Sequence, residues 1–161
     1  MIYAGVDPGK SGAIAIIDSE NIAPDNITIY DIPLIGSEID FKELNEILKT
    51  IVTKEHFLVL ENVHAIPGAG AMQSFNFGQT VGALKSNLMC LNIRHKLVTP
   101  KSWQKVLWEG TPIQTNGSKN DTKATSMLAA QKWFPNTKFL KSKDGRIDAA
   151  LIAMYARLTF K

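Results

Sequence analysis

Acidic residues end or open the most apolar stretches of this chain. They are Asp7 after residues 1–6, Glu61 after residues 57–60, and Asp144 and Asp148 at the start of the last apolar segment. An ionised carboxylate beside buried apolar strands costs several kcal/mol unless a cation or hydrogen-bond donors compensate it. A fold that collects these four groups in one place is therefore expected to bind a divalent cation, and the sequence predicts a magnesium site.

Length and composition favour one soluble domain. The 161 residues are 45% hydrophobic and 20% charged, and they match a single domain spanning 1–161. No run of about 18 apolar residues and no N-terminal leader is present, so we expect a cytoplasmic protein, in the host cytoplasm if a phage encodes it. Cys90 is the single cysteine and is expected to be buried, and with three histidines the chain lacks the paired spacing of a zinc site.

The charges are divided between the two parts of the chain. Residues 1–95 contain 6 Lys and Arg against 11 Asp and Glu, a balance of −5, whereas residues 96–161 contain 12 against 4, a balance of +8. A basic segment of this kind fits a polyanionic partner, and nucleic acid is the obvious one. A solvated basic surface without a partner explains the charge balance equally well.

The first part of the chain predicts strands and one amphipathic helix. Residues 1–7 and 11–18 read as two strands joined by a Pro-Gly turn, and a third extended segment is expected near 27–33. Asp40 with a glutamate three residues later predicts a helix start. The uniformly apolar residues 57–60 predict a parallel strand buried on both faces.

The second part predicts helices around one more strand. We expect a glycine-rich loop at 65–71, a helix from Ser74 or Gln79 to Met89, and a strand at 93–98. After these come a short helix from Pro100 with Trp103 and Leu107 facing inward, a loop at 109–120, a helix with Met127 and Leu128 on its buried side, and a last helix at 145–158. This order of elements predicts an α/β fold with a mixed sheet flanked by helices.

Each acidic residue also has a simpler structural explanation. An Asp before Pro-Gly commonly caps a turn, and Asp144 could cap the last helix. Helical spacing, however, puts Asp148 on one stripe with Leu151 and Ile152, the face that should meet the sheet. Asp144 lies four residues earlier, so the two like charges repel unless a cation lies between them. For Asp144 the cap and the metal-ligand roles can coexist.

Two nucleotide-binding motifs are similar to the segment around Asp7 but do not fit it. A P-loop needs four residues between its glycine pair, and here three separate Gly5 from Gly9. An actin-like or sugar-kinase-like phosphate loop needs a fold of two lobes, for which the chain is too short. A nucleotide cofactor is therefore not expected.

Oxygen ligands favour Mg²⁺ or Mn²⁺, and a pair of such ions about 3.5–4 Å apart can hydrolyse a phosphodiester. In this interpretation Asp7 lies between the two ions, Glu61 serves one, and Asp144 and Asp148 serve the other. Lysines near the last helix are candidates for phosphate contacts, although solvent exposure alone would explain them: Lys101, Lys105, Lys119 and Lys123. Phe75 could stack on bases, or it could pack in a core or a subunit contact.

The acidic residues lie within longer motifs that resemble a known family. The motifs are Gly5-Val6-Asp7-Pro8-Gly9 with Gly12, Leu60-Glu61-Asn62-Val63, Thr99-Pro100-Lys101-Ser102-Trp103-Gln104-Lys105, and Asp144-Gly145-Arg146-Ile147-Asp148-Ala149-Ala150-Leu151. In this order they resemble the RuvC family of Holliday-junction resolvases, and the short chain is most similar to bacteriophage-encoded members. The four-residue spacing of the last two acids also matches the phage-type pattern.

The resemblance implies a ribonuclease H-like fold and a homodimer with two Mg²⁺ ions per subunit, for which Mn²⁺ substitutes. It also implies paired symmetric nicks across a four-way DNA junction. By position, Asp7, Glu61 and Asp148 fall on the family's acidic ligands, Lys101, Lys105 and Lys123 on its basic positions, and the helix after the glycine loop on its dimer helix. His64 replaces an aromatic residue that bacterial members insert at the junction centre, which leaves Phe75 as a substitute. Cleavage by junction shape, with little sequence choice, is the corresponding hypothesis.

Three other functions remain to be distinguished from this one. A nuclease of the same fold could cut forks or flaps as readily as four-way junctions. A noncatalytic junction-binding module would not depend on Asp7 for any of its functions. A small ATPase or kinase would bind nucleotide.

Overall fold

A five-stranded mixed sheet forms the centre of the protein. The structure is a computed structural model that describes residues 1–20, 26–63 and 70–160. The strands are β1 (Ile2–Asp7), β2 (Ala13–Asp18), β3 (Ile27–Asp31), β6 (His56–Glu61) and β7 (His95–Val98), in the spatial order β3-β2-β1-β6-β7. β1, β6 and β7 are parallel, whereas β2 and β3 run antiparallel to their neighbours. The predicted α/β fold with a mixed sheet is confirmed.

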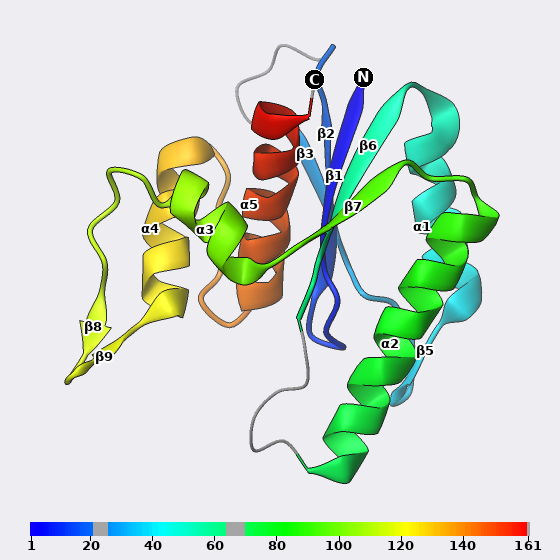
Figure 1. Cartoon of the computed structure of the whole chain (residues 1–161), viewed down its shortest axis with the longest axis horizontal. Helices are drawn as coiled ribbons and strands as arrows, with labels where there is room; N and C mark the ends of the chain where they lie inside the picture. The colour runs from blue at the N-terminus through cyan, green and yellow to red at the C-terminus, as the bar shows by residue number, and fades with distance from the viewer. Residues whose placement is uncertain (21–25, 64–69, 161) are drawn as a thin grey trace.

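Helices cover both faces of the sheet (Figure 1). On one face lie α1 (Phe41–Lys49), followed by a short 3-10 turn, η1 (Thr50–Thr53), and α2 (Ala71–Cys90). On the other lie α3 (Pro100–Leu107), α4 (Thr122–Trp133) and α5 (Asp144–Thr159). Two small hairpins complete the described chain: β4 (Leu34–Ile35) with β5 (Glu38–Ile39), and β8 (Thr115–Asn116) with β9 (Lys119–Asn120). None of the described helices has the length and apolar character to cross a membrane.

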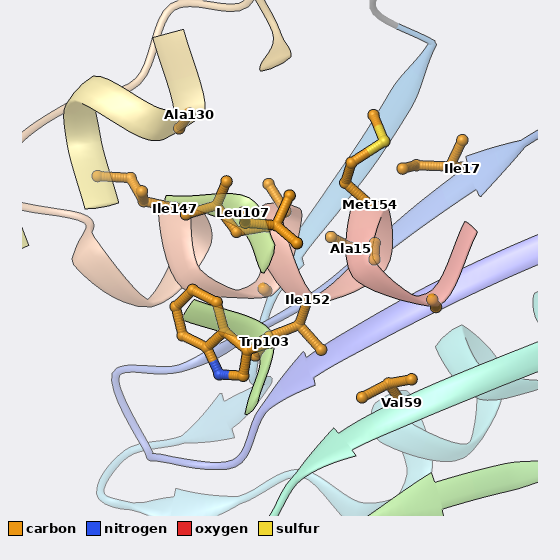
Figure 2. Packing of buried hydrophobic residues seen from close by; sticks show 14 of the residues in the cluster. Ala15, Ile17, Val59, Trp103, Leu107, Ala130, Ile147, Ile152 and Met154 are labelled. Carbon is orange, nitrogen blue, oxygen red and sulfur yellow. The ribbon is translucent and has the colours of Figure 1, made fainter. Parts of the chain in front are cut away.

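Side chains alternate between the two faces of the sheet, as strand geometry requires. In β1, Val6 joins the hydrophobic cluster under α1 and α2, whereas Tyr3 joins the cluster around α5. In β6, Leu60 likewise joins the cluster under α1 and α2, and Val59 joins the cluster around α5. The two cores are therefore separated by the sheet, and α5 is the centre of the larger one (Figure 2).

Helix α5 packs directly on β1 because Gly5 has no side chain. A Cβ built on Gly5 would overlap the backbone nitrogen of Ala153 and would lie 2.5 Å from the carbonyl oxygen of Ala149. Alanines on the facing side of α5 permit the same close approach. Strand and helix backbones are thus in van der Waals contact at this crossing, which fixes the height of α5 over the sheet.

Several local expectations are confirmed and others are wrong. Asp40 caps α1 by accepting a hydrogen bond from the backbone N–H of Glu43 at 3.0 Å, and Trp103 and Leu107 are fully buried. Helix α2 begins at Ala71, earlier than predicted, and residues 109–120 contain the β8–β9 hairpin where a plain loop was expected. Cys90 is exposed, because it falls on the outer side of the last turn of α2. Leu128, expected in the core, is 38% exposed. The predicted glycine-rich loop and His64 fall largely outside the described residues.

Candidate metal centre

Asp7 and Glu61 lie side by side at the ends of neighbouring parallel strands. Val6 of β1 pairs with Leu60 of β6, so the next residue on each strand is an acid at the same height in the sheet. Both acids follow the strand alternation that sends Gly5 and Val59 toward α5. The two carboxylates therefore leave the same edge of the sheet on the same face.

The first two turns of α5 bring Asp144 and Asp148 to this edge. Gly145 packs on the β1–β2 turn so closely that an added Cβ would overlap the carbonyl oxygen of Ser11 and lie 3.1 Å from Oδ2 of Asp7. Asp148 follows one turn later, next to the Gly5 crossing. Asp144 is the first residue of α5 and Lys143 is its N-cap, so the cap role considered for Asp144 is not observed.

Each of the four carboxylates accepts a hydrogen bond from a protein donor or forms an ion pair with a protein cation. Trp103 Nε1 donates to Glu61 Oε1 at 2.8 Å, and Lys123 Nζ lies 2.5 Å from Asp144 Oδ2. The Ser126 hydroxyl bonds the carboxylate of Asp148, and the backbone N–H of Gly9 bonds that of Asp7. Oδ1 of Asp148, by contrast, is buried and has no hydrogen-bond partner. An acceptor of this kind requires a donor or a cation, since burial without a partner is costly.

Burial and mutual repulsion raise the pKa values of three of these acids. Desolvation, followed by the charges of Glu61 and Asp148, raises the pKa of Asp7 to about 7. Burial raises the pKa of Glu61 to about 7 and that of Asp148 to about 6, although the hydrogen bonds from Trp103 and Ser126 oppose these shifts. The bond from Lys123 instead lowers the pKa of Asp144. Three of the four groups thus hold negative charge with difficulty in the absence of a cation.

The donor set suits a hard divalent cation. All of the groups are carboxylate oxygens, the ligands preferred by Mg²⁺ and Mn²⁺, and Asp148 offers a buried oxygen without a partner. Within residues 1–20, 26–63 and 70–160, no three His, Cys, Asp or Glu side chains stand at the spacing of a complete metal centre. Side-chain rotation would therefore accompany ligation, and ligation by Asp7, Glu61, Asp144 and Asp148 stays a prediction.

The candidate DNA-binding residues lie on several surfaces. Lys101 and Lys105 are exposed on α3, and Lys119 is exposed on β9. Lys123 pairs with Asp144 and so belongs to the acidic site in this structure. Phe75 is 63% exposed on α2, which excludes the core-packing role considered for it. Figure 1 shows α2 across the sheet from α3 and α4.

Sequence reasoning missed the residues that orient the acids. Trp103 was expected only as an apolar core residue, although its position in a motif with Thr99 and Lys105 was a usable signal. Ser126 is 3% exposed in the middle of α4, where a buried hydroxyl must find an acceptor, but nothing in the sequence identifies Asp148 as that acceptor. Gly145 was noted only as part of a motif.

Replacing Trp103 with Phe tests the orienting role of the indole. The variant keeps most of the buried aromatic volume but removes the donor to Glu61, so we expect a loss of about 1–2 kcal/mol in stability and weaker Mn²⁺ binding. Loss of a hydrogen bond that orients a metal ligand typically weakens metal binding by about 10–100-fold. Calorimetric titration with Mn²⁺ measures the change. Trp133→Phe, which removes a bond to the carbonyl of Leu107 away from the acids, is the matched control and should bind Mn²⁺ like the wild type.

Comparison with solved structures agrees with this architecture. The structure of Thermus thermophilus RuvC in complex with a Holliday junction substrate matches at a TM-score of 0.59, with 12% sequence identity, over 99% of this chain and 96% of that chain. The Thermus thermophilus RuvC structure matches at 0.58, with 15% identity, over 98% and 96%. The chain has the RuvC fold. No family model and no curated protein matches the sequence. At these identities the similarity to RuvC establishes the mixed-sheet, ribonuclease H-like fold and no more.

Proposed function

We propose that this protein is a magnesium-dependent endonuclease that resolves four-way DNA junctions by paired symmetric nicks. The observation that carries the proposal is the meeting of Asp7, Glu61, Asp144 and Asp148 at one sheet edge, with an unpartnered oxygen on Asp148. The structural match to a RuvC bound to a Holliday junction supports branched DNA as the partner.

The chain's own residues would prepare the reaction by holding charge in place. Asp7 and Glu61 are held by the sheet, and Trp103 and Ser126 fix the orientation of Glu61 and Asp148. Two bound Mg²⁺ ions would supply an activated water and stabilise the leaving oxygen. Lys101 and Lys105, exposed on the helix that carries Trp103, would hold backbone phosphates close to the acids.

A homodimer is part of the proposal because a four-way junction has near twofold symmetry and needs two opposed cuts. Exposed apolar side chains on α2 support this helix as the subunit contact: Met72, Phe75 and Met89. An alanine Cβ on Gly78 or Gly82 of α2 would meet no atom within 4 Å, so a second helix could approach there closely.

The decisive experiment incubates the purified protein with a synthetic four-way junction in Mg²⁺ and, separately, in Ca²⁺. We expect symmetric nicks in Mg²⁺ only, mapped on sequencing gels, with binding in both. Equal rates on forks or flaps would favour the broader branched-DNA nuclease. Binding without nicking in Mg²⁺ and in Mn²⁺ would favour the noncatalytic junction-binding module.

Metal binding should stabilise the fold in a pH-dependent way. Since the pKa values of Asp7 and Glu61 are raised to about 7, the native state holds more protons than the unfolded chain between about pH 4 and 7. The metal-free protein therefore loses stability as pH rises through this window, and the loss is complete above it. We expect 10 mM Mg²⁺ to raise the melting temperature by about 5 °C at pH 8 and by almost nothing at pH 5, where protons compete.

Thermal denaturation in Mg²⁺, in EDTA and in NaCl of matched ionic strength measures this dependence. Equal melting temperatures in Mg²⁺ and EDTA at pH 8 would contradict the metal site.

A further inference from the structure

A cavity of about 500 Å³ lies beside the candidate metal centre and is not used by the chemistry proposed above. It lies between one side of α4, from Lys123 to Gln131, the first turn of α5, and the segment that precedes β8. Asp144 lines both the cavity and the acidic site. Its volume is within the range of sites that bind small organic groups, about 300–1,000 Å³.

The walls of the cavity are largely apolar. Met127 and Leu128 of α4 face it from one side and Ile147 of α5 from the other. Helical spacing predicted that Leu128 lies in the core, but its side chain is 38% exposed. It is exposed because it lines the cavity. The apolar surface is therefore available to a flat organic group.

The polar groups of the cavity are balanced. Gln114 and Gln131 contribute side-chain amides, each of which has a donor and an acceptor end. The charged lining residues are two lysines and two aspartates: Lys123, Lys141, Asp121 and Asp144. With no net charge the cavity has no preference for a phosphate. Apolar walls with two amides among the lining residues are suited to a neutral heterocycle that has hydrogen-bonding edges, although Nε2 of Gln114 also donates to the carbonyl oxygen of Pro112 at 3.1 Å.

We propose that this cavity receives one unstacked nucleobase of the DNA strand that is cut. The inference rests on the proposed nuclease function and deepens it. Because Asp144 borders both sites, a nucleotide could place its phosphate at the acids and its base in the cavity. Unstacking a base costs a few kcal/mol in a duplex and less where pairing is already broken, as at a branch point. The cavity would thus favour branched DNA, because linear DNA can place a base in it only by paying the full free energy of unstacking that base.

The test uses 2-aminopurine, whose fluorescence rises when the base leaves the stack. Four-way junctions carry the probe singly at each of three positions on either side of the mapped nick, and the protein is added in Ca²⁺ so that no cutting occurs. We expect an increase of about threefold or more at one position. Leu128→Trp, which fills the cavity, should abolish the increase and reduce nicking in Mg²⁺ about tenfold while the Mn²⁺-induced rise in melting temperature is kept.

Leu158→Trp is the matched control. Leu158 is also an exposed leucine, at 43%, but it lies near the other end of α5, so this variant should behave as the wild type. Ala124→Leu also narrows the cavity from α4, and it should likewise abolish the fluorescence increase. It replaces Leu128→Trp in the test if Leu128→Trp folds poorly. The inference would be overturned if the fluorescence increase persisted in both cavity variants. It would also be overturned if the wild type nicked the junction but gave no increase at any probe position. A wild type that does not nick at all would instead overturn the proposed function.

Discussion

Replacing Asp7 with Asn is expected to lower the rate of junction nicking by about 10³-fold, which corresponds to about 4 kcal/mol in the barrier. Asp7 is the acid nearest the centre of the group, since the charges of Glu61, Asp148 and Asp144 all act on it. A neutral amide at this position removes the charge that would attract the cation and hold it in place. Gel-based nicking assays in saturating Mg²⁺ measure the rate, and fluorescence anisotropy in Ca²⁺ should show junction affinity within about threefold of the wild type.

Asp18→Asn is the control for this experiment. Asp18 ends β2 at the opposite edge of the sheet, where it pairs with Lys54, so the same substitution there should leave nicking unchanged. Nicking by Asp7→Asn at the wild-type rate would refute the assignment of the acids. Loss of nicking in both variants would indicate a general effect of lost surface charge.

The same Asp7→Asn variant should be more stable than the wild type when metal is absent. Folding raises the pKa of Asp7 to about 7, so at pH 8 the native state must keep a charge that burial and the neighbouring acids disfavour. Removing it should stabilise the fold by about 2 kcal/mol, roughly half of what the full pKa shift implies. Chemical denaturation in EDTA at pH 8 measures the change. Gain of stability with loss of nicking would separate a functional acid from a structural one.

Gly5→Ala is expected to destabilise the protein by at least about 3 kcal/mol, or to prevent folding at 37 °C. The added Cβ would overlap backbone atoms of Ala153 and Ala149, and backbone cannot move aside as a flexible side chain can. Urea denaturation monitored by circular dichroism gives the free energy of unfolding. Gly70→Ala, at the residue before α2, where an added Cβ meets no atom within 4 Å, should instead cost less than about 1 kcal/mol. A loss of less than about 1 kcal/mol in Gly5→Ala would contradict the close crossing of β1 and α5.

The sequence predicted the elements whose signals are local. The alternation and length of the apolar runs were sufficient for β1, β2 and β6, and Asp40 marked the start of α1 by a hydrogen bond within its own turn. The acids at the strand ends were recognised because a charge after a buried strand is unusual. Their meeting at one edge follows from the parallel pairing of β1 and β6. The sequence indicated a buried parallel strand at 57–60 but did not identify its partner.

The features that could not be predicted from the sequence depend on which helices and strands pack against one another. The hydrogen bond from Trp103 to Glu61 requires α3 to lie over the end of β6, and no spacing rule gives that distance. The exposure of Leu128 depends on the cavity between α4 and α5, which exists only once both helices are docked. Cys90 was assigned to the core because its neighbours are apolar, but the last turn of α2 turns it outward.

The backbone contact between β1 and α5 has a consequence for how sequences with this fold can diverge. Backbone contact at Gly5 and Gly145 sets the relative position of two pieces of chain without any pair of matched side chains. Most of the surrounding residues can therefore be substituted while the four acids keep their relative positions, provided that both positions remain glycine. Only 12% of the residues coincide with those of the Thermus protein, although the two structures match at a TM-score of 0.59, so most positions of this architecture tolerate substitution.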